Sequence, residues 1–141
     1  MTRIPPHSID MERAVLGAML LSRLSIDTAL DSLTANDFHD ATYARVFSAI
    51  AMLYHAGKPV DRALIVEQSD VSKQTLLELE AATPASMHTR RYCEIVKEKS
   101  AFRRAIRFGE ELVDAAYGEN VEHVDKLLAD PFAFVLPDYE L

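Results

Sequence analysis

The 141-residue sequence has little of what defines several protein classes. Its one cysteine, Cys93, rules out a disulfide within the chain, and a neighbouring tyrosine in a helical segment indicates a packed thiol rather than a nucleophile. The longest purely apolar stretches, such as residues 14–21, reach less than half of the roughly 20 residues that cross a bilayer. The sequence therefore predicts neither a disulfide scaffold nor a transmembrane helix.

Motifs for secretion, metal binding and nucleotide binding are also missing. Two prolines and an acidic residue stand where a secretory signal has its apolar run, which favours a cytoplasmic protein. The five histidines are scattered, and none has the spacing that presents several ligands to one metal ion. The Gly57–Lys58 pair is not a P-loop, because Met52 replaces its first glycine and Pro59 its hydroxyl residue. We therefore expect no cofactor, no ATP hydrolysis and no enzyme.

The composition is that of an ordinary globular protein. Hydrophobic residues make up 49% of the chain and charged residues 26%, and the length suits a single domain. The formal net charge of −7 argues against extensive binding to nucleic acid, because affinity for a phosphate backbone depends on positive charge. Direct contact with nucleic acid is thus expected to be weak or absent outside a local basic patch.

Apolar residues recur at intervals of three and four along the chain, and no strand pattern interrupts them up to residue 130. Polar residues that cap helices precede most of these periodic segments. The candidate caps are Ser8, Ser25, Asp61, Ser72 and Asn120, and further helices are expected to begin near Asp40 and at Ser86. We expect helices over about residues 9–21, 26–33, 40–56, 61–68, 72–82, 86–117 and 121–130.

The segment 86–117 contains no proline and predicts one long helix. Thirty helical residues extend about 45 Å, whereas a domain of this size has a radius of gyration near ~14 Å. We expect the far end to project or to pair, with Gly109 permitting close packing. The predicted fold is all-α: a compact helical head (1–85), the long helix and a short hairpin arm of the same domain (86–130), and an apolar C-terminal arm (131–141), extended or a short edge strand.

Seven of the fifteen basic residues lie between positions 90 and 107, where only Glu94 and Glu98 are acidic, so this window carries +5 and the rest of the chain −12. The seven are Arg90, Arg91, Lys97, Lys99, Arg103, Arg104 and Arg107. One interpretation is a solvated helix face supported by ion pairs one turn apart. The other is a docking surface for an acidic partner or DNA, whose binding would weaken with salt.

Three segments in the same order resemble the N-terminal domain of DnaB-type replicative DNA helicases. They are PPHSIDMERAVLGAMLL, LTANDFHDATYARVFSAIAMLYHAGKPVD and ATPASMHTRRYCEIVKEKSAFRRAI. The resemblance implies a helical head followed by a helical hairpin, and in that family the hairpins pair subunits into a collar that contacts primase.

The sequence departs from the family pattern at two places. Residues 60–84 are compact and glycine-free where the family has a longer, glycine-rich stretch. Pro131 breaks the helix where the family continues its hairpin and the linker to its motor, so the second arm is expected to be short and dimerisation through it is in question. The apolar residues after it are candidates for a substitute contact. These are Phe132, Phe134, Val135 and Leu136.

Three functional hypotheses follow. The first is a non-enzymatic protein–protein interaction module of DNA replication, a possible homodimer, with a replicative helicase, primase or helicase loader as partner. The second is a detached N-terminal part of a helicase whose unwinding activity lies in other residues; the ending VLPDYEL favours a complete small protein instead. The third is a DNA-binding regulator that uses the basic helix. The candidate interaction residues are the seven cations together with Phe132, Phe134 and Leu136.

Overall fold

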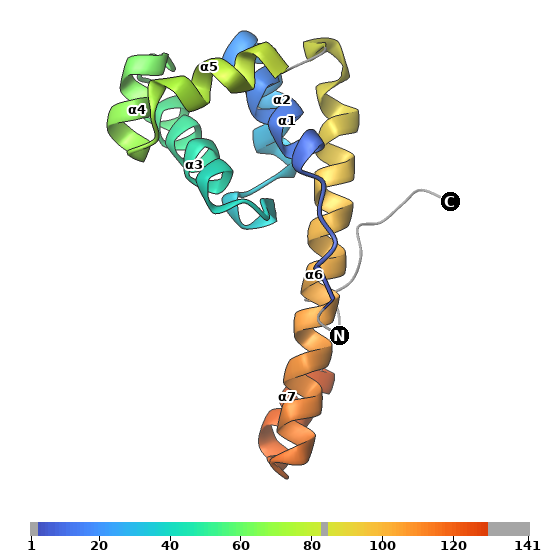
Figure 1. Ribbon diagram of the computed structural model, residues 1–141. Coiled ribbons are helices and arrows are strands. Elements are labelled where there is room, and N and C mark those ends of the chain that lie inside the picture. Colours follow the sequence, from blue (N-terminus) through green and yellow to red (C-terminus); the bar gives the residue numbers. More distant parts are fainter. Residues whose placement is uncertain (1–2, 83–84, 130–141) are drawn as a thin grey trace.

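The computed structural model describes residues 3–82 and 85–129, in which helices are the only regular elements (Figure 1). The α-helices are α1 (Ile9–Leu21), α2 (Arg23–Ser32), α3 (Ala41–His55), α4 (Arg62–Ser69), α5 (Lys73–Ala82), α6 (Thr89–Tyr117) and α7 (Val121–Ala129), with 3-10 helices η1 (Ala35–Asp37) and η2 (Ser86–His88). The predicted all-α class is confirmed for these residues. The C-terminal arm predicted for 131–141, with Phe132, Phe134 and Leu136, lies outside them, so its role stays a prediction.

Most of the predicted helix starts coincide with the observed ones, because their capping side chains accept backbone N–H groups. Asp40 accepts the amide of Tyr43, and Asp61 accepts that of Leu64. The cap predicted for α2 was wrong: Ser22, not Ser25, accepts the amide at 3.3 Å. Ser25 is instead buried against α6, a long-range contact that local spacing does not reveal.

The core is built around α1. Its centre, from Ala14 to Met19, is buried on every side rather than along a single face, because α2, α3, α5 and α6 all pack against this helix. Gly17 and Ala18 leave room for these neighbours. Large side chains from the later helices complete the core. They include Ile50, Ile65, Leu76 and Leu79.

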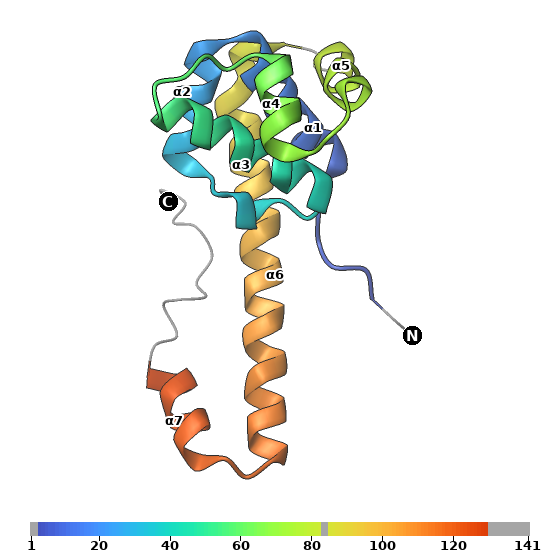
Figure 2. The ribbon, with the colours of Figure 1, turned by 90° about the vertical axis from the view of Figure 1, so that its left-hand side faces the viewer.

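The longest helix, α6, has two environments along its 29 residues. Its first turns pack against α1 and α2 in the head, and the remainder extends beyond the head, with α7 folded back beside its end (Figures 1 and 2). At 1.5 Å per residue the helix is about 44 Å long. None of the helices in the described segments combines the length and the apolarity needed to span a membrane.

Candidate interaction surface

A buried carboxylate holds α6 to the head at the point where the helix leaves it. Asp37 is 3% exposed. Its Oδ1 accepts the Ser100 hydroxyl at 2.7 Å, and its Oδ2 accepts the Thr34 amide at 2.8 Å and the Lys97 ammonium at 3.2 Å. Thr34 and Asp37 therefore form a capping pair at η1, and the same carboxylate also binds α6.

Arg103 adds a second connection at this junction. Its guanidinium donates to the carbonyl of Asp37 at 2.7 Å and to the carbonyl of Pro6 at 2.8 Å, which fixes the N-terminal segment along α6. Burial lowers the pKa of Arg103 from its ordinary value, while the nearby carboxylates of Glu12 and Asp37 oppose that shift. The side chain stays charged at neutral pH, because an arginine pKa starts far above it.

Glu12 is a third buried group at the junction, and sequence reasoning missed its role. Its carboxylate is 1% exposed and accepts the backbone amides of His39 and Asp40 at 3.0 and 3.1 Å. It thereby fixes the turn that leads into α3. The only sequence signal was an acidic residue in the first turn of a helix, where a solvent-exposed position is the usual interpretation.

The seven predicted interaction cations fall into two groups. Lys97 and Arg103 point into the junction and are bonded within the protein. Within the described part of the chain, the other five form no such hydrogen bond or ion pair with the head. Arg90, Arg91 and Arg107 are exposed, Lys99 and Arg104 are half-buried, and Arg91 forms an ion pair of 3.1 Å with Glu94. A docking role for any of the seven stays a prediction.

Residues 102–117 of α6, which run from the junction with the head to the end of the helix, are together with α7 called the arm below. Four apolar side chains lie on one face of its α6, because their spacings of four, seven and four residues return to the same side of a helix. These are Phe102, Ile106, Val113 and Tyr117, with exposures from 38% to 87%. Gly109 lies on the same face, and a Cβ at its position would meet no atom within 4 Å. The arm thus carries an exposed apolar stripe.

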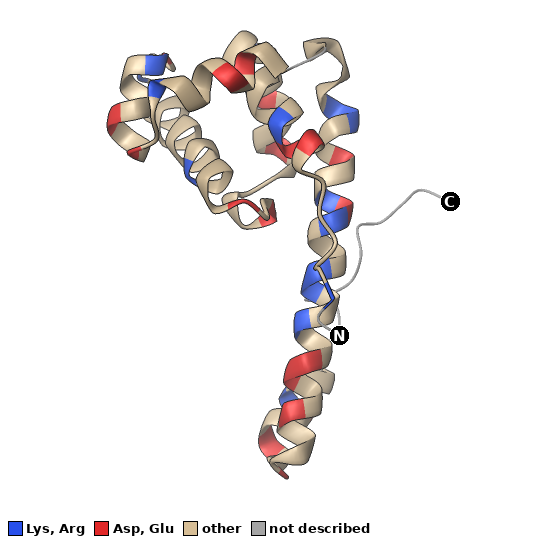
Figure 3. Ribbon diagram, in the orientation of Figure 1, with Lys and Arg blue, Asp and Glu red and all other residues tan. Residues whose placement is uncertain are grey.

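The arm is also electrically divided along its length. Basic residues occupy the middle of α6, and acidic residues occupy its end and α7 (Figure 3). Residues 108–129 contain six acids and one lysine, a net charge of −5, directly after the basic window. Arg107, Glu110 and Asp114 are exposed and flank the apolar stripe on the same side. The stripe therefore has a positive end near the head and a negative end at the tip.

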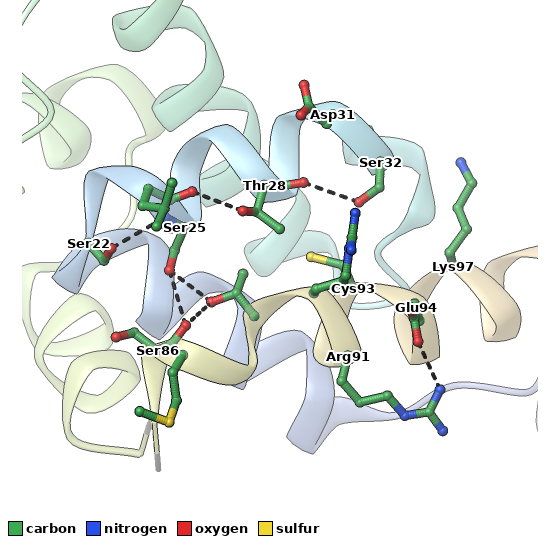
Figure 4. Close-up of a pocket in the computed structure, with 14 residues that line it drawn as sticks. Ser22, Ser25, Thr28, Asp31, Ser32, Ser86, Arg91, Cys93, Glu94 and Lys97 are labelled. Atoms are coloured by element: carbon green, nitrogen blue, oxygen red, sulfur yellow. Dashed lines mark hydrogen bonds and ion pairs between the residues drawn. The ribbon is translucent and has the colours of Figure 1, made fainter.

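Cys93 lies between α2 and α6, with its side chain toward Ser32 (Figure 4). Burial raises the pKa of its thiol from an ordinary value of 9.0 to about 11, and a hydrogen bond with Ser32 opposes the shift. We expect iodoacetamide to alkylate Cys93 in the folded protein at pH 8 about 100-fold more slowly than in the urea-unfolded protein, measured by mass spectrometry, since the thiolate is the nucleophile.

The same shift of the Cys93 pKa has a consequence for stability. The unfolded thiol ionises near 9 and the folded thiol near 11, so folding opposes ionisation. The protein therefore has its full free energy of unfolding below pH 9, where the thiol is neutral in both states. That free energy falls as the pH rises from 9 towards 11, because only the unfolded thiol ionises readily there. Equal alkylation rates in the folded and unfolded protein would contradict a buried, neutral thiol.

Comparisons with known proteins agree with this architecture. Residues 4–98 match the family described as the DnaB-like helicase N-terminal domain. The chain belongs to that family. It is 34% identical over 134 residues to the replicative DNA helicase DnaB of Geobacillus stearothermophilus, a match that covers 89% of this chain and 29% of the relative. A match of 30% identity to the replicative DNA helicase DnaC of Bacillus subtilis covers 91% of this chain and 30% of that protein.

Two solved structures share the fold of this DnaB-like N-terminal domain. The N-terminal domain of DnaB helicase from Mycobacterium tuberculosis superposes with a TM-score of 0.84 at 30% identity, covering 92% of this chain and 99% of that one. A DnaB-like replicative helicase, described with its interactions with primase, shares the fold at a TM-score of 0.75 and 20% identity over 32% of its length. The chain therefore spans under a third of the full-length helicases that it matches.

Proposed function

We propose that this DnaB-like N-terminal domain acts in DNA replication by contact rather than catalysis, and that the arm is its self-association surface. The observation that carries the proposal is the exposed apolar stripe of Phe102, Ile106, Val113 and Tyr117. An apolar stripe at helical spacing, rimmed by charge, is the usual form of a helix–helix interface. The 141 residues contain no P-loop, so these residues supply no ATP hydrolysis.

The charge division indicates how two copies would pair. In an antiparallel arrangement the basic part of one arm lies against the acidic tip of the other, whereas a parallel arrangement places like charges together. Arg107 and Glu110 flank the stripe near its middle, so each faces its opposite in the second copy. The small Gly109 at the centre allows the two helices to approach closely.

The heterologous partners that we propose are a replicative helicase, primase or helicase loader, in the cytoplasm where replication takes place. The support is membership of a helicase domain family and the relative described with primase. In this proposal the head (1–85) and the long helix with its hairpin partner (86–130) belong to one domain. A helicase subunit with the same fold would present the same self-complementary arm, so this chain would join or block helicase assembly.

The second hypothesis, a detached N-terminal part of a helicase, is favoured by one observation: the curated relatives match over only 29% and 30% of their length. This hypothesis requires the same arm surface, and it differs from the first in that a separate motor protein must act together with this chain. A P-loop ATPase encoded immediately downstream, whose unwinding activity requires this chain, would favour it. The DNA-binding regulator loses support, because Lys97 and Arg103 are already bonded within the protein.

We expect size-exclusion chromatography with light scattering to show a dimer of this chain alone and a complex when the helicase or primase of the same cell is added. The apparent association should weaken as salt rises, because exposed charges at the rim are screened. Single-stranded DNA, added as a control, should give no stable complex. A strict monomer that binds neither protein would overturn the proposal, and tight, salt-sensitive DNA binding would favour the regulator.

A further inference from the structure

A groove of about 1220 Å³ runs along the line where α2 packs against the first turns of α6, on the head and away from the arm. The two helices run parallel along it: Ser25 contacts Thr89 near their starts, and Ser32 lies beside Cys93 further on (Figure 4). Both N-termini therefore lie at the same end of the groove. The C-terminus of α1 lies at this end too, because Ser22 both ends α1 and caps α2, and its dipole opposes theirs.

Four of the hydroxyl groups that line the groove have hydrogen-bond partners within the protein. Thr28 donates to the carbonyl of Leu24 at 3.0 Å, Ser32 donates to the carbonyl of Thr28 at 3.4 Å, and Ser25 shares a hydrogen bond of 2.8 Å with Thr89. Since these groups already have partners, the groove floor offers few free hydrogen-bonding groups to a small polar ligand. The features left for a partner are at the rim.

The rim of the groove combines apolar surface with cations. Leu24 and Met87, from opposite walls, are 74% and 83% exposed. Arg90 is exposed and forms no ion pair within the described segments. Arg91 pairs with Glu94 only across an exposed turn of α6, an interaction that contributes little and exchanges readily. Large exposed apolar side chains beside free cations are typical of a docking site for an amphipathic, acidic segment.

We propose that this groove binds an acidic amphipathic helix of a partner protein. Its apolar side chains pack on Leu24 and Met87, and its carboxylates lie at Arg90 and Arg91. The ten residues of α2 are about 15 Å long, which matches roughly three turns of a bound helix.

Two synthetic peptides of about 12 residues test this proposal, both with leucines at every third or fourth position. One has glutamates between the leucines and the other has lysines. We expect the glutamate peptide to shift the amide resonances of α2 and the start of α6 in the ¹⁵N-labelled chain, and the lysine peptide to bind at least about tenfold more weakly. Failure of the glutamate peptide to bind at millimolar concentration would overturn the proposal.

Variants of exposed residues locate the binding without disturbing the fold. Arg90→Glu and Met87→Ser should each weaken binding of the glutamate peptide by at least about tenfold, as for central interface residues. Arg45→Glu and Met52→Ser, also exposed but on α3, are the matched controls and should leave binding unchanged. Equal effects of the groove variants and the control variants, or resonance shifts confined to the arm, would contradict binding in this groove. The oligomeric state of Arg90→Glu, which should stay that of the wild type, separates this result from failure of arm pairing.

Discussion

Replacing Ile106 with glutamate is expected to prevent the self-association that we propose for the arm, leaving a monomer. Ile106 lies near the centre of the apolar stripe and is 45% exposed in the single chain, so the folded monomer tolerates a charge there. In the paired state the carboxylate would be buried against a second apolar stripe, which costs several kcal/mol. We expect the dissociation constant to rise at least about 100-fold, measured by sedimentation equilibrium.

The matched control is Met52→Glu, which places the same charge at an exposed apolar position on α3, far from the arm. This variant should retain the wild-type sedimentation behaviour, and both variants should retain the wild-type helical circular dichroism. Persistence of the dimer in Ile106→Glu would mean that the copies associate through another surface. Dissociation of both variants would indicate a general effect of added negative charge.

Replacing Asp37 with alanine is expected to cause a large loss of stability. The carboxylate is buried, and its removal leaves the Thr34 amide, the Ser100 hydroxyl and the Lys97 ammonium without their acceptor. Breaking one side of a buried ion pair typically costs about 3–5 kcal/mol in the free energy of unfolding. Urea denaturation followed by circular dichroism measures this difference.

The control for Asp37→Ala is Asp31→Ala, which removes an exposed carboxylate from α2. Its effect should stay within about 0.5 kcal/mol, as for most surface substitutions. Lys97→Met in the Asp37→Ala background should recover part of the loss, because the unpaired cation is then removed as well. An Asp37→Ala protein as stable as the wild type would show that the junction does not depend on this carboxylate.

The junction changes the interpretation of the basic window. In the sequence its seven cations look alike, and all seven are candidates for docking a partner. In the structure Arg103 and Lys97 connect α6 to Asp37 and to the N-terminal segment. These hydrogen bonds attach the long helix to the head. Substitutions at the two positions should therefore affect stability as well as any binding.

Much of the fold followed from the sequence alone. Helix ends were predictable because capping is local: Asp40, Asp61 and Asn120 each accept an amide three residues further on. Apolar spacing likewise identified the long helix over 86–117, observed as η2 followed by α6. The family was also recognisable from three short segments, since turns and caps leave readable signatures in a sequence.

What the sequence could not determine is how residues far apart in the chain meet. Glu12 and the His39 amide are 27 positions apart, and Asp37 and Ser100 are 63 apart. No periodicity relates such pairs, because their proximity depends on how α1, η1 and α6 pack. Tertiary structure alone therefore decided which cations are bonded within the protein, which apolar residues of α6 remain exposed on the arm, and where α2 and α6 leave a groove. The sequence by itself determined the helices; their packing decided which surfaces are left for partners, since burial is a property of the assembled fold.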